Sequence, residues 1–429
     1  MKETLKKIVA GILAWEARRV LKRFVPRVVA VTGSVGKTST KDAIVAVLEH
    51  SAHVRGSDKS YNSEFGVPLT ILGLANAWRS PVGWAKNLIQ GFLIPFTARG
   101  YPDWLVLEVG ADKPGDIKSL SRWLHPDVVV VTRIGEVPVH VEHFGSPLHI
   151  VEEKASLVKA VREGGAVVLN NDDEKVRNMK VPFGVQVRSY GFGEGASVRG
   201  VNAHILYEED HPMGMTVKVE TDGKSVPLRL KNVFGVHAVM PALAALTVTE
   251  LLHVNILDAI KGLEWLLPAP GRLRLIGGAK GSLILDDTYN SSPVALHAAL
   301  DTVQELQIKG RKIAVLGDMM ELGVYSQEEH KKAGRHAATV CEKLYLVGKF
   351  SIFTEEGARQ GGMSADRIKR FDTAERAGVT LLKEIEKGDL ILVNGSQSVR
   401  MERVVVKIMQ EPELAPELLV RQEQEWQKR

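Results

Sequence analysis

A glycine-rich segment near the start of the chain carries the residue types that bind phosphate groups. It reads Thr32-Gly33-Ser34-Val35-Gly36-Lys37-Thr38-Ser39-Thr40 and lies between an apolar run and a segment with helical periodicity. Glycines let backbone N–H groups face phosphate oxygens, Lys37 can neutralise the outer phosphates, and the Thr38 hydroxyl can ligate Mg²⁺. Val31 stands where the usual pattern has a further glycine. The segment therefore predicts a variant phosphate loop, whose nucleotide contacts come from Gly33, Ser34, Val35, Gly36, Lys37, Thr38 and Ser39.

Acidic side chains end two other apolar runs. Glu108 follows the run that begins at Trp104, and Asp286 and Asp287 end the run that begins at Leu283. Parallel sheets bind ligands beyond the carboxyl ends of their strands, which favours Glu108 as an Mg²⁺ ligand. The two aspartates could instead cap a turn, but their place at a strand end favours ligand contact.

The scaffold for these residues is predicted by an alternation of apolar runs and helical segments. This pattern is typical of a mainly parallel sheet with helices on both faces. The strands expected first are 28–32, 104–109, 128–132 and 166–169. Alternating residues at 215–220 and 226–230 predict a small antiparallel insertion before a long helix at 236–252.

A second α/β alternation follows Pro268-Ala269-Pro270-Gly271, a segment that cannot continue a helix. Its expected strands are 283–287, 312–317, 343–347 and 390–393. We therefore predict an α/β fold, with a central domain built around the phosphate loop and a smaller Rossmann-like C-terminal domain. The expected boundaries are 1–26 for an N-terminal amphipathic helix, 27–270 for the central domain and 271–429 for the C-terminal domain.

Composition indicates an ordinary globular protein of two or three domains. The chain has 429 residues, of which 45% are hydrophobic and 25% charged, with a net charge of +5. Its one cysteine, Cys341, excludes an internal disulfide and a thiolate metal cluster. The apolar run 8–15 is too short to span a bilayer. Residues 3–25 read instead as an amphipathic helix that docks on the protein or, less expectedly, makes a weak contact with a membrane surface or another protein.

Several further motifs, in order from about residue 27 to 405, resemble those of the Mur ligases. The resemblance is strongest to the branch of that family that adds D-alanyl-D-alanine. The motifs are the variant phosphate loop, Tyr61 to Thr70, Glu108 to Ala111 with Pro114 to Ile117, Asp286 to Pro293, and Leu316 to Gly323 with His330 after it.

The resemblance implies an ATP-dependent amide ligase, which phosphorylates a substrate carboxylate and lets an amine attack the acyl phosphate. In the branch that the chain resembles, the carboxylate belongs to a UDP-muramoyl tripeptide, the amine is that of D-alanyl-D-alanine, and the product is a peptidoglycan precursor. By the same resemblance the protein is a cytoplasmic monomer that uses ATP and two Mg²⁺ ions, which phosphoryl transfer needs beside the phosphates. Nucleic acid is not an expected partner.

The resemblance also assigns roles that residue types alone leave open. His140 resembles the family's metal-site histidine, with His143 as its rival, whereas a lone histidine is more often structural. Lys154 aligns with the lysine that the family carbamylates, although Ser156 stands where the family often has an acid. The expected catalytic residues are Lys37, His140 and Lys154. The expected metal ligands are Thr38, Glu108, His140 and carbamylated Lys154. Arg272, Asp287 and Tyr289 are expected at the nucleotide, and Asn62, Ser63 and Ser396 at the substrate.

Three departures from the family pattern leave the substrates open. About 26 residues precede the first expected strand, where family members carry a domain that grips the uridine diphosphate end of the substrate. The family's Gly-x-His-Asn-x-x-Asn-Ala motif has lost both asparagines at 235–242, and its Lys-Gly-Ser-Arg motif has lost both cations at 394–397, where Arg400 is a candidate replacement. The alternatives are a ligase for another carboxylate and amine, such as a folate polyglutamylating enzyme, or a catalytically silent ATP-binding partner subunit.

Overall fold

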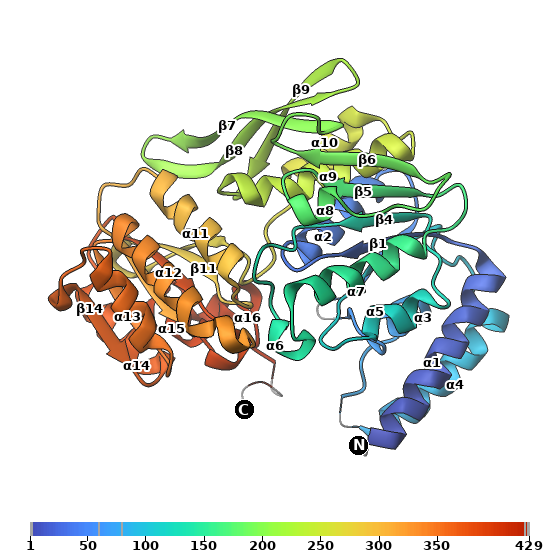
Figure 1. Ribbon diagram of the computed structural model, residues 1–429, viewed down its shortest axis with the longest axis horizontal. Coiled ribbons are helices and arrows are strands. Elements are labelled where there is room, and N and C mark those ends of the chain that lie inside the picture. Colours follow the sequence, from blue (N-terminus) through green and yellow to red (C-terminus); the bar gives the residue numbers. More distant parts are fainter. Residues whose placement is uncertain (1–2, 59–60, 79, 424–425, 427–429) are drawn as a thin grey trace.

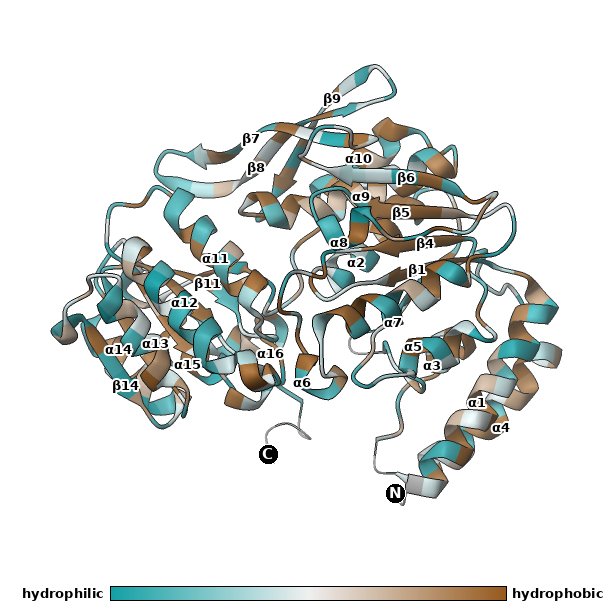
Figure 2. Ribbon diagram, viewed as in Figure 1, coloured by the Kyte–Doolittle hydropathy of each residue, from teal (hydrophilic) through white to brown (hydrophobic). Residues whose placement is uncertain are grey.

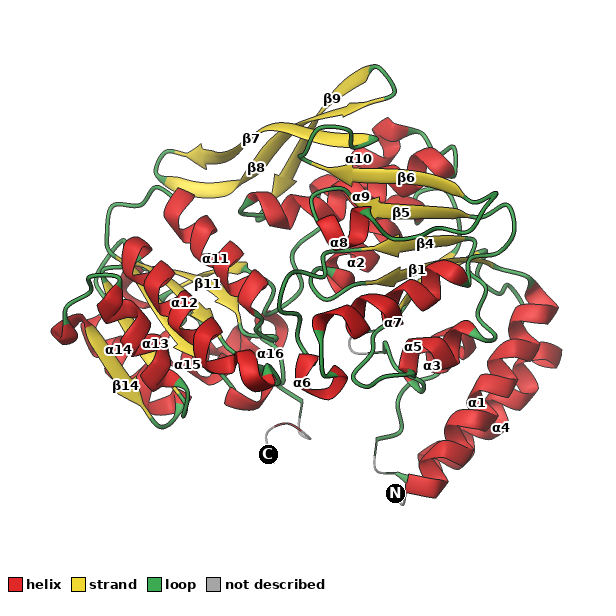
Figure 3. Ribbon diagram, viewed as in Figure 1, coloured by secondary structure: helices red, strands yellow, loops and turns green. Residues whose placement is uncertain are grey.

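A computed structural model of the chain describes residues 3–58, 61–78, 80–423 and 426. Two β-sheets, each with helices on both faces, make up the body of the molecule (Figures 1 and 3). The expected α/β class is thus confirmed. The expected segments 1–26 and 271–429 include residues outside the described ranges, and their boundaries stay predictions.

The first sheet has nine strands in the order β2-β3-β1-β4-β5-β6-β7-β8-β9. Pairing is parallel from β2 to β7, and the β7–β8 and β8–β9 pairs are antiparallel. The expected small insertion is therefore the antiparallel edge of this sheet. The strands are β1 (Arg27–Thr32), β2 (Val54–Gly56), β3 (Trp104–Glu108), β4 (Val128–Val131), β5 (Ala166–Asn170), β6 (Gln186–Gly191), β7 (Val198–Glu208), β8 (His211–Thr221) and β9 (Lys224–Lys231).

Alternate residues of β1 supply the two cores on either face of this sheet. Val29 and Val31 pack in the core beneath α2 and α9, whereas Val28 and Ala30 pack in the core beneath α1, α3, α5 and α7. A strand buried on both faces reads as a continuous apolar run, which is why this strand is visible in the sequence. The helices are α1 (Glu3–Phe24), α2 (Lys37–Leu48), α3 (Gly66–Leu72), α4 (Pro81–Thr97), α5 (Asp116–Ser121), α6 (Val141–Phe144), α7 (Pro147–Lys159), α8 (Glu174–Arg177), α9 (Val236–Leu251) and α10 (Ile256–Glu264).

The second sheet has six strands in the order β10-β11-β15-β12-β13-β14, all parallel except β10. Helices α11 and α12 cover one face, and α14 and α15 cover the other. The elements are β10 (Arg274–Gly277), β11 (Leu283–Asp287), α11 (Pro293–Glu305), β12 (Lys312–Gly317), α12 (Ser326–Val340), β13 (Lys343–Val347), α13 (Ser351–Gln360), β14 (Ile368–Phe371), α14 (Ala374–Glu384), β15 (Leu390–Asn394), α15 (Glu402–Ile408) and α16 (Ala415–Leu418). Short 3₁₀ helices occupy Ala279–Gly281, Gly323–Tyr325, Ala365–Arg367, Gln397–Val399 and Pro412–Leu414.

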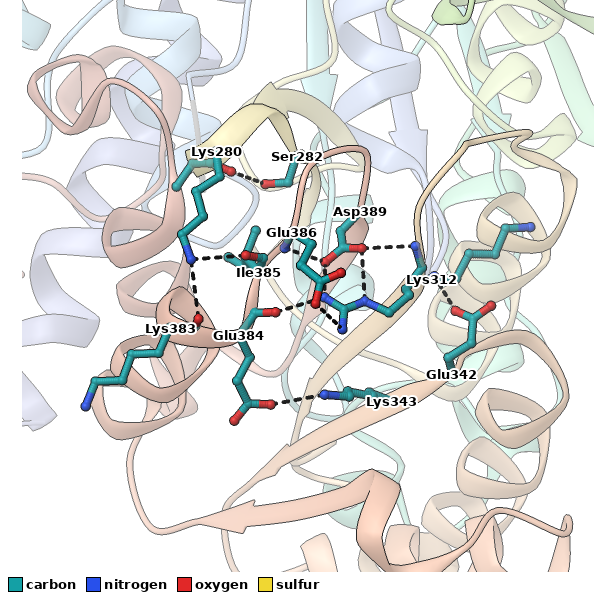
Figure 4. Close-up of polar contacts among 12 residues, drawn as sticks. Lys280, Ser282, Lys312, Glu342, Lys343, Lys383, Glu384, Ile385, Glu386 and Asp389 are labelled. Carbon is teal, nitrogen blue, oxygen red and sulfur yellow. Dashed lines mark hydrogen bonds and ion pairs between the residues drawn. The ribbon is translucent and has the colours of Figure 1, made fainter.

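A network of ion pairs ties together the amino-terminal edge of the second sheet (Figure 4). The carboxylate of Asp389, which is buried, accepts hydrogen bonds from the Arg311 backbone and guanidinium and from the Glu386 N–H. Glu384 accepts from Lys343 and from the Tyr345 hydroxyl. These charges lie at the opposite ends of the strands from the carboxyl edge, so their role is to hold the sheet together.

Candidate functional site

The phosphate loop joins β1 to α2 in a conformation that needs its glycines. Gly33 and Gly36 have φ angles of +143° and +85°, which glycine adopts at little cost. A Cβ on Gly33 would lie 1.9 Å from the Thr132 hydroxyl oxygen. Gly36 begins α2 without a side-chain cap, so the N–H groups of the first helical turn point into open space with partial positive charge. The loop is fixed by Ser34 and Val35, whose N–H groups donate to the Arg133 carbonyl at 2.8 and 3.0 Å.

Thr38 and Glu108 meet beside this loop. The Thr38 hydroxyl donates to Glu108 Oε2 at 2.8 Å, and the Asn62 side chain donates to Glu108 Oε1 at 3.2 Å. The Glu108 N–H donates in turn to the Ser57 hydroxyl at 3.1 Å. The Thr38 hydroxyl and the Glu108 carboxylate therefore lie together, and both are oxygen ligands of the kind that Mg²⁺ prefers.

Lys154 reaches the same loop from α7. Its ammonium is buried and donates to the Gly33 carbonyl at 2.8 Å. Its pKa is lowered to about 7, mainly by burial and in part by the Lys37 charge, while Glu153, Asp112 and Glu108 oppose the shift. Burial likewise lowers the pKa of Lys37, with Glu108 opposing and Arg272 adding to the effect. A lysine of this kind holds a reactive neutral amine near neutral pH.

His140 joins the two halves of the molecule. Its Nδ1 contacts Glu321 Oε2, and its Nε2 lies 3.6 Å from Asp112 Oδ1. His140 and Glu321 both have positive φ angles, 69° and 63°. The hydrogen bond with His140 lowers the pKa of Glu321, although burial opposes it. His140 therefore lies next to Asp112, whose charge also acts on Lys37 and Lys154.

The four expected Mg²⁺ ligands do not all converge. Thr38 and Glu108 are in contact, Lys154 contacts the loop backbone, and His140 faces Asp112 and Glu321. In the part of the chain that the structure describes, no three His, Cys, Asp or Glu side chains form a ready metal cage. Mg²⁺ ordinarily takes one or two protein ligands and completes its shell with phosphate oxygens and water, so Thr38 and Glu108 fit such an ion.

A cavity of about 680 Å³ opens between the two sheets next to the loop. From the first sheet it is lined by Val35, Gly36 and Ser39, and from the second by Arg272 and Asp287. The other expected nucleotide contacts, Gly33, Ser34, Lys37, Thr38 and Tyr289, do not line it. The cavity has room for a nucleoside, with its phosphates directed at the start of α2.

Arg272 and Asp287 line the cavity from the second sheet, and Tyr289 lies behind Arg272. The Arg272 guanidinium lies over the Tyr289 ring at 3.9 Å. Burial raises the pKa of Asp287 to about 7, and the Arg272 charge and the hydrogen bond from Asn394, 2.7 Å long, oppose this shift. Asp286, by contrast, accepts from the Gly271 and Thr288 N–H groups and from the Thr288 hydroxyl, so it holds the turn.

Comparison with known proteins identifies the family. Residues 31–82 and 89–249 match the family model "Mur ligase middle domain", and residues 271–397 match "Mur ligase, glutamate ligase domain". The UDP-N-acetylmuramoyl-tripeptide–D-alanyl-D-alanine ligase of Bacillus subtilis is 30% identical over 92% of this chain and 79% of its own length. The chain belongs to the Mur ligase family.

Solved structures of this family agree with the assignment. The MurF ligase from Thermotoga maritima, in complex with ADP, is 29% identical with a TM-score of 0.76, over 94% of this chain and 84% of its own. MurF from Acinetobacter baumannii has the same TM-score at 26% identity, over 93% and 79% of the two chains. The expected family, fold class and kind of enzyme, an ATP-dependent ligase, are confirmed.

The residues expected at the substrate of this Mur ligase fall into two places. Asn62 contacts Glu108 beside the loop, but the Ser63 hydroxyl accepts from the Gly66 N–H and caps α3. The buried Ser396 hydroxyl accepts from the Met320 N–H at 2.8 Å, at the carboxyl edge of the second sheet. Arg400, the candidate replacement cation, is instead paired with Glu402 at 2.5 Å.

Sequence reasoning missed several residues of the site. Glu321 and Asp112, the partners of His140, are acids in loops that gave no separate signal, although Glu321 lies within a family motif. Asn170 and Asn290 line the cavity beside His237, whose pKa burial lowers to about 4. Asn170 ends β5, and this position at the carboxyl edge of a parallel strand is a signal that could have found it.

Proposed function

We propose that this Mur ligase joins a substrate carboxylate to an amine through an acyl phosphate, with a UDP-muramoyl tripeptide and D-alanyl-D-alanine as its substrates. The observation that carries the proposal is the meeting of the Thr38–Glu108 pair and Lys154 at the phosphate loop, whose Val35 and Gly36 line the cavity. ATP binds with its base in the cavity and its phosphates at the start of α2, and Lys37 neutralises the charge that develops on the transferred phosphoryl group.

The chain's own residues take defined parts in this proposal. Thr38 and Glu108 would hold a first Mg²⁺, and carbamylated Lys154 with His140 would hold a second; such ions would supply positive charge that screens the phosphates. Arg272 and Asp287 contact the nucleotide from the second sheet. Asn62 orients Glu108. The cavity is completed by one chain, which supports a monomer, and the nucleotide-linked substrates support a cytoplasmic enzyme.

The test is phosphate release from ATP and Mg²⁺ with each substrate alone and with both. We expect release only when UDP-muramoyl tripeptide and D-alanyl-D-alanine are present together, and we expect Lys37→Met to abolish it. Lys159→Met, which removes an exposed lysine of α7, is the matched control and keeps the activity. Release without the dipeptide, or no release at all, contradicts the proposed substrate pair.

One observation favours a second candidate, a Mur-type ligase with another carboxylate and amine. Asn394 stands where the family has a lysine, and its side chain is buried, donating to Asp287 and accepting from the Ser291 hydroxyl at 2.6 Å. With Arg400 also paired, this edge of the second sheet lacks the cations that the family presents. Phosphate release with other acyl and amine substrates, but not with the muramoyl pair, would favour this candidate.

A further inference from the structure

Helix α1 has two apolar faces, of which only one is buried. Val9, Leu13, Ala17 and Val20 pack in the core with α3 and α4. A second stripe at helical spacing faces away from that core, formed by Leu5, Ile8, Ile12 and Trp15, which are 49%, 54%, 36% and 45% exposed. Docking of α1 on the protein therefore leaves a second apolar face without a partner among the described residues.

Helix α4 extends this stripe into one surface. The Trp15 and Phe92 rings are stacked with centroids 6.3 Å apart, and Phe92 contacts Phe96 at 6.1 Å. Val82, Ile89 and Phe96 are 79%, 63% and 69% exposed. We call the combined surface the apolar patch; it consists of Leu5, Ile8, Ile12, Trp15, Val82, Ile89, Phe92, Leu93 and Phe96. Contiguous exposed apolar surface of this kind marks an interaction site.

The two helices project together from the body of the molecule (Figures 1 and 2). The Glu16 side chain packs against Gly91, where a Cβ would lie 2.2 Å from Glu16 Oε2. Phe24, at the end of α1, stacks on Tyr101 just after α4, with centroids 4.6 Å apart. The apolar patch is thus presented on a fixed frame, away from the cavity between the sheets.

The charge around the patch is positive. On α1 the exposed cations are Lys6, Lys7, Arg18, Lys22 and Arg23, and on or next to α4 they are Lys86 and Arg99. From residue 4 to 24 and from 81 to 99 the one acid is Glu16, which is buried between the helices.

Arg19 lies at the centre of the aromatic cluster. Its guanidinium lies 4.7, 4.8 and 5.3 Å from the rings of Trp15, Phe92 and Phe96. The Arg19 Nη1 atom is buried and has no hydrogen-bond partner in the described structure.

We propose that the apolar patch docks on the surface of an anionic lipid bilayer. Apolar and aromatic side chains enter the interface between headgroups and acyl chains, while the surrounding lysines and arginines contact lipid phosphates. No helix among the described ranges is long and apolar enough to cross a membrane, so the contact is with one face of the bilayer. A second copy of the chain would present the same positive charge and repel the first, which favours the lipid over self-association.

The experiment is co-sedimentation of the full chain with vesicles of phosphatidylcholine, alone or mixed with phosphatidylglycerol. We expect binding to the mixed vesicles that falls with salt, and much weaker binding to phosphatidylcholine alone. The double variant Ile8→Asp, Phe96→Asp should lower the affinity for mixed vesicles roughly tenfold or more, because it places two anions on the patch. Phe183→Asp, which changes a fully exposed phenylalanine elsewhere, should leave it unchanged.

A second pair of variants tests the role of the positive charge around the apolar patch. Lys22→Glu with Arg23→Glu should also weaken binding to mixed vesicles roughly tenfold, whereas Lys159→Glu on α7 should not. All variants change exposed side chains, and unchanged thermal midpoints in solution verify their folds. The proposal is overturned if the wild type ignores mixed vesicles or binds both kinds equally. It is also overturned if the protein forms a concentration-dependent dimer that Phe96→Asp dissolves, since the patch is then an interface between copies.

Discussion

At the scale of single residues, Lys154 is the position whose chemistry is most open to test. Its pKa of about 7 means that the amine is largely neutral above pH 7 and protonated below it. Carbamylation joins a neutral amine to carbon dioxide with loss of one proton, so the modified fraction should rise as pH increases through 7. We expect ligase activity at pH 8 to fall roughly tenfold in buffer freed of carbon dioxide and to recover with bicarbonate, and we expect bicarbonate to restore less activity at pH 6.

The measurement is initial rate against pH, with and without bicarbonate, together with the ¹³C signal of a carbamate formed from labelled bicarbonate. Lys154→Ala should lose the activity, the bicarbonate response and the signal. Lys159→Ala, five positions later on the exposed side of α7, should keep all three. Full activity in Lys154→Ala, or a rate indifferent to bicarbonate, would show that the amine itself, held on the Gly33 carbonyl, has only a structural part.

Residue types alone predicted the phosphate loop and Glu108, because these functions depend on local sequence and on a strand end. Residue types did not decide the roles of His140 and Lys154, because each role depends on partners far away in the chain. Glu321, the partner of His140, is separated from it by 181 positions. Only folding brings such residues together, so their pairing has no periodicity or spacing that a sequence displays.

At the scale of elements, the strands buried on both faces were predictable and several partly exposed strands were not. β1, β3, β4, β12 and β15 are buried on both faces and appear as unbroken apolar runs. β6 begins with two exposed residues, and β14, at the edge of its sheet, exposes Arg370, so the apolar signal of these strands is interrupted. α1 was expected as an amphipathic helix, but its second apolar face became visible only once the first was seen to be buried.

The C-terminal segment acts on the site through Arg421. Its guanidinium donates to the Tyr289 carbonyl at 2.9 Å, to the Thr288 carbonyl and to Glu402, so it holds the loop after β11. We expect Arg421→Gln, which leaves Glu402 paired with Arg400, to weaken binding of an ATP analogue roughly fivefold. Titration calorimetry measures this, with Arg403→Gln on the surface of α15 as the control. Equal affinities in both variants would contradict a positioning role.

At the scale of the whole molecule, the two halves meet around the site, and the buried Phe234 of the first half packs in the core beneath α11 and α12. Gly135 lies against Val294, the Tyr207 hydroxyl accepts from the Gln307 N–H at 2.9 Å, and His140 contacts Glu321. Most of these contacts are single side chains on loops. The relative position of the halves therefore depends on the connection between them, which passes through Gly271 just before β10.

Substitution of Gly271 should lower the activity. Its φ angle is +69°, and a Cβ there would lie 2.7 Å from the Tyr289 nitrogen. Gly271→Ala must therefore push apart the segment that carries Arg272 and the loop after β11 that carries Tyr289, and we expect ligase activity to fall roughly tenfold or more because a small misplacement at a site is costly. Gly164→Ala is the matched control, since Gly164 has a φ of +70° and open space around it. The Gly164→Ala variant has the strain of the left-handed backbone, about 1–2 kcal/mol, without a steric clash, and it should keep its activity. Rates compared at a temperature where both variants are folded decide the matter: equal activity in the two would mean that close packing at Gly271 does not position the nucleotide loop.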